Sequence, residues 1–242
     1  MPFQTAPPLS HAGGRATNQD CAGWREADGA TCWVLADGLG GHASGEVASE
    51  AAVEGALTAF ENRPGTDAET VQRCINRAQS VVRTLQEGSP SLDSMRTTLV
   101  VAVARGQQVR WGHVGDSRLY HFREGRIAGR TTDHSVPQAL VEAGEIGPAD
   151  VRGHPDRNRL LQAVGGNSAP RATIAEASGV QSGDALLLCS DGFWELVEEE
   201  EMEADLAAAS SPEAWLSAME ARLTARADGR HDNYSALATW AT

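Results

Sequence analysis

The sequence contains no lysine, and all 20 of its basic side chains are arginine. The P-loop lysine of nucleotide-binding enzymes, the Schiff-base lysine and the Ser-Lys nucleophile pair are therefore excluded. Acidic residues also outnumber basic ones, because the chain has 33 Asp and Glu residues and therefore a formal net charge of -13. Nucleic acids and anionic membrane surfaces bind dense cationic patches, so neither is an expected partner. We expect metal cations or basic proteins to supply the opposing charge.

Cysteines and long apolar runs are scarce as well. The four cysteines show neither C-x-x-C spacing nor a paired histidine motif, so we expect reduced thiols in or near the core, without a zinc site or a disulfide framework. No stretch approaches the ~20 apolar residues that span a bilayer, and the first residues carry no basic and apolar signal segment. We therefore expect a cytoplasmic protein and a monomer. With 242 residues and 41% apolar content, the chain suffices for one layered domain over residues 1–242.

Hydrophobic periodicity divides the chain into runs of strands and pairs of helices. Apolar stripes at helical spacing predict helices over residues 44–60, 67–86, 135–143 and 212–227. Short β-branched or aromatic runs predict strands over residues 21–26, 31–36, 97–104, 109–114, 119–122, 185–189 and 235–240. Asp28 and Gly29 predict a tight hairpin between the first two strands, and the three strands between residues 97 and 122 predict an antiparallel meander. This order favours an α+β sandwich of layers over an alternating βαβ sheet.

Five aspartates lie beside the ends of these predicted strands: Asp20, Asp37, Asp116, Asp191 and Asp232. Any single Asp-Gly pair of this kind is usually just a turn. Several carboxylates gathered at one end of a sandwich repel each other at low dielectric, and therefore require protons or hard divalent cations. Ligation by oxygen alone favours magnesium or manganese. The pattern predicts a divalent metal site at one end of the sheets.

Two neighbouring segments extend this predicted site. Asp37 leads into a glycine-rich loop whose backbone permits close approach, so the carbonyl of Gly38 is a candidate metal ligand. The loop lacks the G-x-G-x-x-G spacing of dinucleotide-binding loops, and the chain has neither a G-x-S-x-G elbow nor an H-E-x-x-H pair. Arg15 stands five residues before Asp20 and suits bidentate hydrogen bonding to a phosphate. The alternative for Arg15 is a surface salt bridge to a neighbouring acid.

Several short motifs follow one another in a recognisable order. They are residues 15–20 (RATNQD), 36–42 (ADGLGGH), 96–99 (RTTL), 113–118 (HVGDSR), 132–135 (TDHS), 154–158 (HPDRN), 189–192 (CSDG) and 232–233 (DN). Spread over nearly the whole chain, this set resembles the bacterial metal-dependent PP2C/PPM protein phosphatases. The resemblance implies a four-layer α-β-β-α sandwich, in which two antiparallel sheets pack face to face with metals in the cleft between sheet edges. It also implies a flap over residues 145–159.

The resemblance further implies a set of metal ligands. Asp37 would bridge two Mn2+ or Mg2+ ions, and the backbone carbonyl of Gly38 would bind one of them. Asp191 and Asp232 would hold the other ion. Asp116 matches the position that in bacterial members binds a third, weaker metal together with Asp191. Cations about 3.5–4 Å apart acidify a bridging water, which would attack phosphorus in line without a phosphoenzyme.

Three other residues take part in the implied reaction. Arg15 would clamp the phosphate, and Asp20 would orient the metal-bound waters. His42 is the nearest candidate for the general acid that protonates the leaving hydroxyl, although a metal-bound water can serve instead. Asn233 is expected to be only a turn residue.

Three positions depart from the family pattern. Gln19 stands where many members carry Glu, which removes one water-mediated metal contact. Leu39 occupies the position of a histidine in animal enzymes, so that histidine's role does not transfer. Arg96 replaces the usual glycine before Thr97 and is expected to affect phosphosite preference.

The residues and the resemblance together predict a Mg/Mn-dependent phosphatase that acts on phosphoserine and phosphothreonine in proteins and opposes a bacterial Ser/Thr kinase. A narrower version would dephosphorylate a regulatory antagonist in a sigma-factor switch. The competing hypothesis is a non-catalytic phosphoprotein-binding regulator that retains the fold. The acidic run from Glu198 to Asp205 is expected to be a solvated helix start or loop, with docking of a basic kinase segment as the alternative.

Overall fold

The computed structural model describes residues 2–40 and 44–242 of the chain. Its strands form two antiparallel sheets. The β4 sheet has the order β10-β7-β6-β4-β3, with β5 paired to β4; it contains β3 (Asp20–Ala27), β4 (Ala30–Leu39), β5 (Arg96–Thr97), β6 (Leu99–Arg105), β7 (Gln108–Val114) and β10 (Thr173–Ser178). The β12 sheet has the order β1-β12-β11-β8-β9, with β2 paired to β12; it contains β1 (Phe3–Thr5), β2 (Leu9–His11), β8 (Arg118–Arg123), β9 (Arg126–Arg130), β11 (Ala185–Cys189) and β12 (Tyr234–Ala241).

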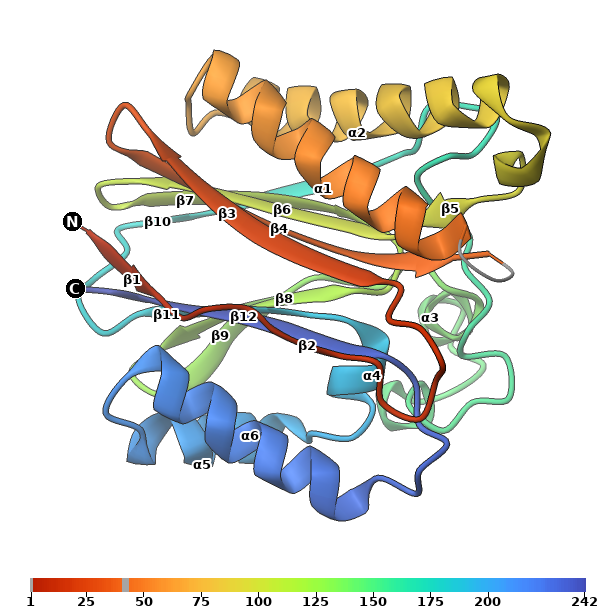
Figure 1. The fold of residues 1–242 in the computed structure, drawn as a ribbon. Coiled ribbons are helices and arrows are strands. Elements are labelled where there is room, and N and C mark those ends of the chain that lie inside the picture. The colour runs from red at the N-terminus through yellow and green to blue at the C-terminus, as the bar shows by residue number, and fades with distance from the viewer. Residues whose placement is uncertain (1, 41–43) are drawn as a thin grey trace.

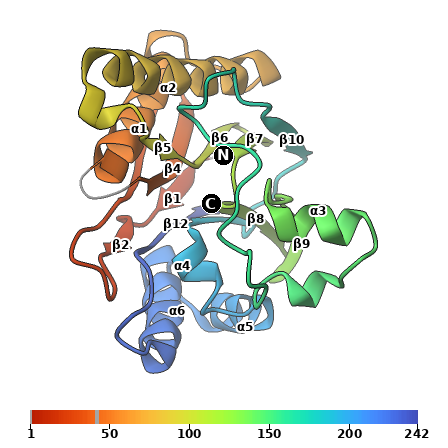
Figure 2. The same ribbon diagram turned by 90° about the vertical axis from the view of Figure 1, so that its right-hand side faces the viewer.

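Helices cover the outer face of each sheet, which gives four layers (Figure 1). The long helices α1 (Ser44–Asn62) and α2 (Ala68–Gly88) lie over the β4 sheet, while α5 (Glu199–Ala208) and α6 (Pro212–Arg226) lie over the β12 sheet. The short helices α3 (Val136–Glu142) and α4 (Asp191–Trp194) lie towards one end of the sandwich (Figure 2). The predicted α-β-β-α arrangement is therefore confirmed.

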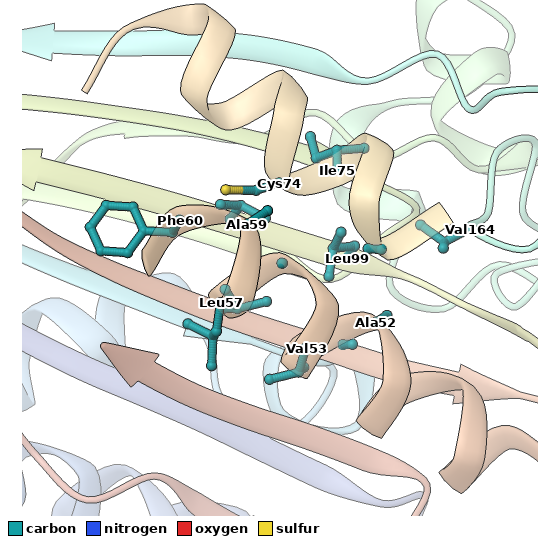
Figure 3. Close-up of a cluster of buried hydrophobic side chains, with 14 of the residues drawn as sticks. Ala52, Val53, Leu57, Ala59, Phe60, Cys74, Ile75, Leu99 and Val164 are labelled. Carbon is teal, nitrogen blue, oxygen red and sulfur yellow. The ribbon is translucent and has the colours of Figure 1, made fainter. Parts of the chain in front are cut away.

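Each interface between layers has its own apolar core. Leu57 and Phe60 of α1 and Ile75 of α2 are buried against the β4 sheet (Figure 3). Trp33 and Leu119 belong to the cluster between the two sheets. Because the alternate residues of each central strand face two different cores, these strands read as almost continuous apolar runs. That property explains why the strands were identifiable from sequence.

Local sequence signals place several boundaries where they were predicted. Asp67 accepts a hydrogen bond from the backbone N–H of Thr70 at 2.7 Å and caps α2. Asp28 and Gly29, with φ of 50° and 71°, form the tight turn between β3 and β4. Positive φ at both turn residues matches the right-handed twist of the paired strands. The predicted hairpin is therefore confirmed.

Other expectations were wrong. β6 and β7 pair as predicted, but β8 joins the other sheet between β11 and β9, so the three middle strands do not form one meander. Apolar runs indicate strands but not the sheet to which a strand belongs. β1, β2, β9 and β10 were not predicted, because they are short or mostly polar runs at or near sheet edges.

The acidic run does begin a helix, α5, but it is only partly solvated. Glu201 forms ion pairs with Arg222 and Arg226, and Glu199 pairs with Arg152 at 2.6 Å. These intramolecular partners account for much of the run's charge. Among the described residues, none of the helices combines the length and apolarity required to cross a bilayer.

Candidate metal centre

Four of the five predicted carboxylates line a cavity of about 150 Å³ at one end of the sandwich, and the fifth, Asp20, lies opposite Asp37 in the β3–β4 pair. The lining of this cavity includes most of the residues singled out from sequence: Arg15, Gln19, Asp37, Gly38, Leu39, Asp116, Asp191, Asp232 and Asn233. They come from segments far apart in the chain that converge where β4, β7, β11 and β12 end or begin. His42 lies outside the described residues. Except for that histidine, the structure brings the predicted site together.

Asp20 and Asp37 face each other across the β3–β4 pair. β4 extends past Asp37 to Leu39, so Asp37 lies inside the strand and not at its end as predicted. Ser190 donates to Asp20 Oδ2 at 2.7 Å, whereas Asp20 Oδ1 is buried without a hydrogen-bond partner among the described residues. A buried carboxylate oxygen without a donor is costly. Asp20 Oδ1 is therefore available to accept a further hydrogen bond.

Two threonines fix the backbone at Asp37. The Asp37 N–H donates to Thr98 Oγ1 at 2.9 Å, and the Asp37 carbonyl accepts from Thr97 Oγ1 at 2.8 Å. Thr98 also shares a hydroxyl hydrogen bond of 2.7 Å with Ser117. These contacts hold the central carboxylate of the cluster in place. They give the motif at residues 96–99 a role that was not inferred from sequence.

Close backbone packing explains two glycines of the site. A Cβ at Gly38 would lie 2.1 Å from the carbonyl oxygen of Gly45 at the start of α1. A Cβ at Gly192 would lie 2.1 Å from the carbonyl oxygen of Asn233. Only glycine allows these approaches, which bring α1 against Gly38 and α4 against β12.

Asn233 does more than form a turn. Its side-chain oxygen accepts from the Gln19 N–H at 2.9 Å, and its amide donates to the carbonyls of Ala12 and Thr17 at 2.8 and 2.9 Å. One side chain thus ties the loop before β3 to the loop before β12, which lie side by side (Figure 1). The expectation of a turn residue alone was incomplete. The signal available in the sequence was an amide, which can donate and accept at once.

Asp116 lies in the turn after β7 and is 4% exposed. Its backbone carbonyl accepts a hydrogen bond of 3.0 Å from the indole N–H of Trp194 in α4. The guanidinium of Arg118 stacks on the Trp194 ring, 3.5 Å from its centroid, and forms a buried ion pair of 2.8 Å with Asp133. Trp194 was not identified from sequence. It connects the Asp116 turn to the helix that begins at Asp191.

Burial makes the carboxylates of this cluster hard to ionise. It raises the pKa of Asp20 to about 6 and that of Asp191 to about 7, and repulsion from Asp232 adds to both. The pKa values of Asp37 and Asp116 are raised well above the usual range by burial and by repulsion from neighbouring carboxylates, Asp191 among them. Such a cluster is stable only with protons or with bound cations.

Arg15 and Asp232 form the exposed side of the site. The guanidinium donates to Asp232 Oδ2 at 2.7 Å, and the two side chains are 54% and 38% exposed. The alternative considered for Arg15, a salt bridge to a neighbouring acid, is thus present in the structure. It does not exclude binding of phosphate, because Arg15 also lines the cavity.

The donor set fits hard divalent cations. Asp37, Asp191 and Asp116 offer only carboxylate oxygens, and Asp20 contributes the unpartnered oxygen behind them. No three His, Cys, Asp or Glu side chains in the described part of the chain already converge as ligands of one ion. Asp232, which would be the third carboxylate, is held by Arg15. Filling of the site would therefore require that this contact be released.

Known proteins with similar sequences and structures are phosphatases. Residues 9–228 match the family model described as protein phosphatase 2C. The chain is 35% identical over 188 residues to the serine/threonine protein phosphatase PstP of Mycobacterium tuberculosis. The aligned segment covers 77% of this chain and 35% of PstP. It is also 35% identical over 195 residues to the serine/threonine phosphatase Stp of Listeria monocytogenes, and that aligned segment covers 78% of this chain and 77% of Stp. The chain thus spans about a third of the length of the mycobacterial relative.

A solved structure of the PstP catalytic domain in complex with two manganese ions superimposes with a TM-score of 0.81 at 31% identity, covering 98% of this chain and 97% of that one. These findings confirm the resemblance inferred from the motifs.

Proposed function

Because this chain belongs to the protein phosphatase 2C family, we propose that it hydrolyses phosphoserine and phosphothreonine in protein substrates at a binuclear Mn2+ or Mg2+ centre. The observation that carries the proposal is the convergence of buried carboxylates and one arginine around a single cavity. Two curated relatives are serine/threonine phosphatases, and one solved relative contains two manganese ions. A basic or apolar binding surface would not need a cluster of carboxylates whose ionisation burial opposes.

All the proposed ligands line the cavity, which supports this assignment. Asp37 and the carbonyl of Gly38 would hold one ion, and Asp37, Asp191 and Asp232 the other; Asp116 would contribute to a third, weaker site. When bound, the cations lower the pKa of a water molecule so that it attacks phosphorus, and they neutralise charge on the phosphate oxygens. Asp20 would orient such a water by accepting a hydrogen bond through Oδ1, which is buried without a partner among the described residues. Its partner Ser190 keeps the other oxygen fixed.

The chain's own residues position the substrate. Arg15 presents an exposed guanidinium at the edge of the cavity, where it binds the phosphate bidentately once Asp232 no longer occupies it. The leaving hydroxyl requires a proton, and we retain His42 or water as its source. We propose that residues 145–159 form a flap over this single domain. Asn158, at the end of that segment, lines the cavity beside Arg15.

We further propose that the enzyme opposes a bacterial Ser/Thr kinase and works as a monomer in the cytoplasm. Three of its four thiols are buried, and all four are unpaired, which suits a reducing compartment.

The test is release of phosphate from a phosphothreonine peptide with Mn2+, with and without EDTA. We expect turnover only when metal is present, and Asp37→Asn should abolish it without loss of the folded state. Folded protein that binds phosphopeptide but releases no phosphate would support the non-catalytic regulator instead. Turnover that persists in EDTA would contradict the metal mechanism.

A further inference from the structure

A second cavity, of about 410 Å³, opens directly beside the metal centre. The two cavities share four lining residues: Arg15, Asn158, Asp191 and Asp232. The remaining walls come from α4, from the loop between α6 and β12, and from the end of the proposed flap. We call this second cavity the arginine pocket, after the lining residues Arg15, Arg157, Arg226 and Arg230. A molecule bound at the metal centre has direct access to it.

The four arginines differ in how firmly they are held. Arg226 is fully engaged, since it donates to both carboxylate oxygens of Glu201 and to the carbonyl of Leu196 at 2.7 Å. Arg157 uses its Nε to donate to Glu195 at 2.8 Å, and its two terminal nitrogens have no partner among the described residues. Arg226 thus forms a wall of the pocket, whereas Arg157 retains free donors.

Arg230 is the most available cation of the pocket. Its side chain is 89% exposed, and the nearest acid is Asp228, whose Oδ2 lies 3.5 Å from the Arg230 Nε. At that distance the contact is loose, and exposed pairs of this kind contribute little. An incoming anion can therefore recruit Arg230 at little cost.

The charge of the pocket depends on the metal centre. Four carboxylates line it, namely Asp191, Glu195, Asp228 and Asp232, so the arginines are formally balanced. Asp191 and Asp232 are also the proposed metal ligands. When cations compensate these two carboxylates, the arginines outnumber the acids that remain. The loaded enzyme then carries a local positive surplus, although the chain as a whole has a net charge of -13.

We propose that the arginine pocket binds a second oxyanion of the substrate protein, a carboxylate or a second phosphate located a few residues from the phosphorylated Ser or Thr. An extended peptide advances about 3.3 Å per residue, so adjoining cavities are reached by residues near the phosphosite. Arg230 and Arg157 are the specificity-determining residues of this pocket. The inference rests on the proposed function, since the phosphate at the metal centre anchors the peptide.

Matched peptides test the inference. Three phosphothreonine peptides differ only in the flanking residues, which are glutamate, glutamine or phosphoserine. The wild-type protein with Mn2+ should show the lowest KM for the two anionic peptides. Arg230→Gln should raise KM for the glutamate and phosphoserine peptides about two- to fivefold, as expected for one exposed charge pair. Its kcat, and its KM for the glutamine peptide, should remain within about twofold.

Two further variants sharpen the test. Arg105→Gln removes the same charge from an exposed position at the far end of β6 from the site, and it should leave the ranking of the peptides unchanged. Arg230→Glu should invert the ranking, so that the glutamine peptide is preferred. Equal KM values of the wild type for all three peptides would overturn the proposal, and so would an identical effect of Arg230→Gln and Arg105→Gln. A preference for phosphoserine over glutamate identifies the second phosphate as the favoured anion.

A binding measurement separates this inference from the proposed function. Fluorescence anisotropy with non-hydrolysable phosphonate versions of the peptides reports affinity without turnover. Tighter binding of the anionic peptides, together with no release of phosphate from any true substrate, would refute the enzymatic function but support the pocket. Turnover together with equal binding of all the peptides would support the enzymatic function and refute the pocket. Failure of every peptide to bind would overturn the pocket as well.

Discussion

The guanidinium of Arg15 donates to Asp232 Oδ2 at 2.7 Å, so the cation proposed to grip phosphate neutralises a carboxylate proposed to bind metal. Both side chains are partly exposed, and such pairs contribute only about 0–1 kcal/mol. If Asp232 binds metal as proposed, loading of the metal centre would break this weak contact and free Arg15 for the substrate. We therefore expect metal to bind before phosphate.

Removal of Arg15 should separate metal affinity from turnover. In Arg15→Gln, Asp232 has no competing cation, so we expect Mn2+ to bind about two- to fivefold more tightly, as measured by calorimetry. Turnover should fall by about 100-fold or more, because the transition state loses a charged donor. Arg63→Gln, which removes an arginine paired with Glu69 at 3.0 Å on the surface, serves as the control. Unchanged or weaker Mn2+ affinity in Arg15→Gln would show that the ion pair does not compete with metal.

Asp191→Asn should make the metal-free protein more stable at alkaline pH. Burial and repulsion from Glu195 raise the pKa of Asp191 to about 7, so the folded state binds more protons than the unfolded state between pH about 4 and 7. Stability of the metal-free wild type therefore falls as pH rises through this window. At pH 8 the variant should gain on the order of 1–3 kcal/mol in urea unfolding, and the gain should vanish near pH 4.

Bound metal should reverse the order of stability, so that the wild type is more stable than Asp191→Asn. Saturating Mn2+ is expected to stabilise the wild type by mass action and Asp191→Asn far less. The exposed Asp93→Asn variant controls for the loss of one negative charge and should follow the wild type in both conditions. If metal-free Asp191→Asn is no more stable than the metal-free wild type at pH 8, burial and repulsion from Glu195 do not raise the pKa of Asp191 as assigned.

His134 should make the protein sensitive to acid. Burial, followed by the neighbouring His113, lowers the pKa of His134 to about 4, and the two rings stack with centroids 4.4 Å apart. His134 Nδ1 accepts from the Gly115 N–H at 3.3 Å, a bond that protonation would remove. The unfolded chain binds this proton more readily, so the contribution of His134 is complete above pH about 6.5 and is lost as pH falls towards 4.

The measurement is urea unfolding at pH 7 and pH 5 for the wild type and His134→Gln. The wild type should lose about 1 kcal/mol more than the variant between these values, discounted for the partial exposure of the ring. Since glutamine does not titrate, a difference that is independent of pH would argue against this role.

Trp194→Phe should weaken the Asp116 turn while preserving stacking with Arg118. The variant leaves the buried carbonyl of Asp116 without its indole donor, which costs about 1–3 kcal/mol. We expect lower stability, together with a higher Mn2+ concentration for half-maximal activity. Trp215→Phe is a matched control, because the Trp215 indole donates to the Met202 carbonyl at 2.9 Å elsewhere in the same apolar cluster, and this variant should affect stability alone. If both variants shift the Mn2+ requirement equally, Trp194 has no special connection to Asp116.

The sequence was most informative where one residue type has a single physical use. Asp28 and Gly29 predicted a turn because few residues adopt positive φ, and the observed angles agree. The aspartates at predicted strand ends indicated a shared site, because carboxylates gathered at low dielectric repel each other unless protons or cations bind them. The four-layer order followed from the family resemblance, since helical and strand periodicities do not tell which faces meet.

Contacts between distant segments were beyond this kind of reasoning. Neither the three side-chain hydrogen bonds of Asn233 nor the link from Trp194 to Asp116 has a local signature, because their partners lie far apart in the chain. β8 was assigned to the wrong sheet for the same reason. The acidic run was taken as solvated because its partners, such as Arg152 and Arg222, come from other elements.

The position of β12 has a consequence for synthesis of the protein on the ribosome. Within residues 1–242 this strand follows all the other described strands, yet it lies inside its sheet, between β11 and the strands β1 and β2 (Figure 1). A nascent chain that ends before Tyr234 therefore cannot close the second sheet, and one that ends before Asp232 also lacks Asp232 and Asn233, which immediately precede that strand. Chains that stop before Asp232 would thus lack an inner strand of the second sheet and two residues that line the candidate metal centre. We expect phosphate hydrolysis only after translation has passed β12.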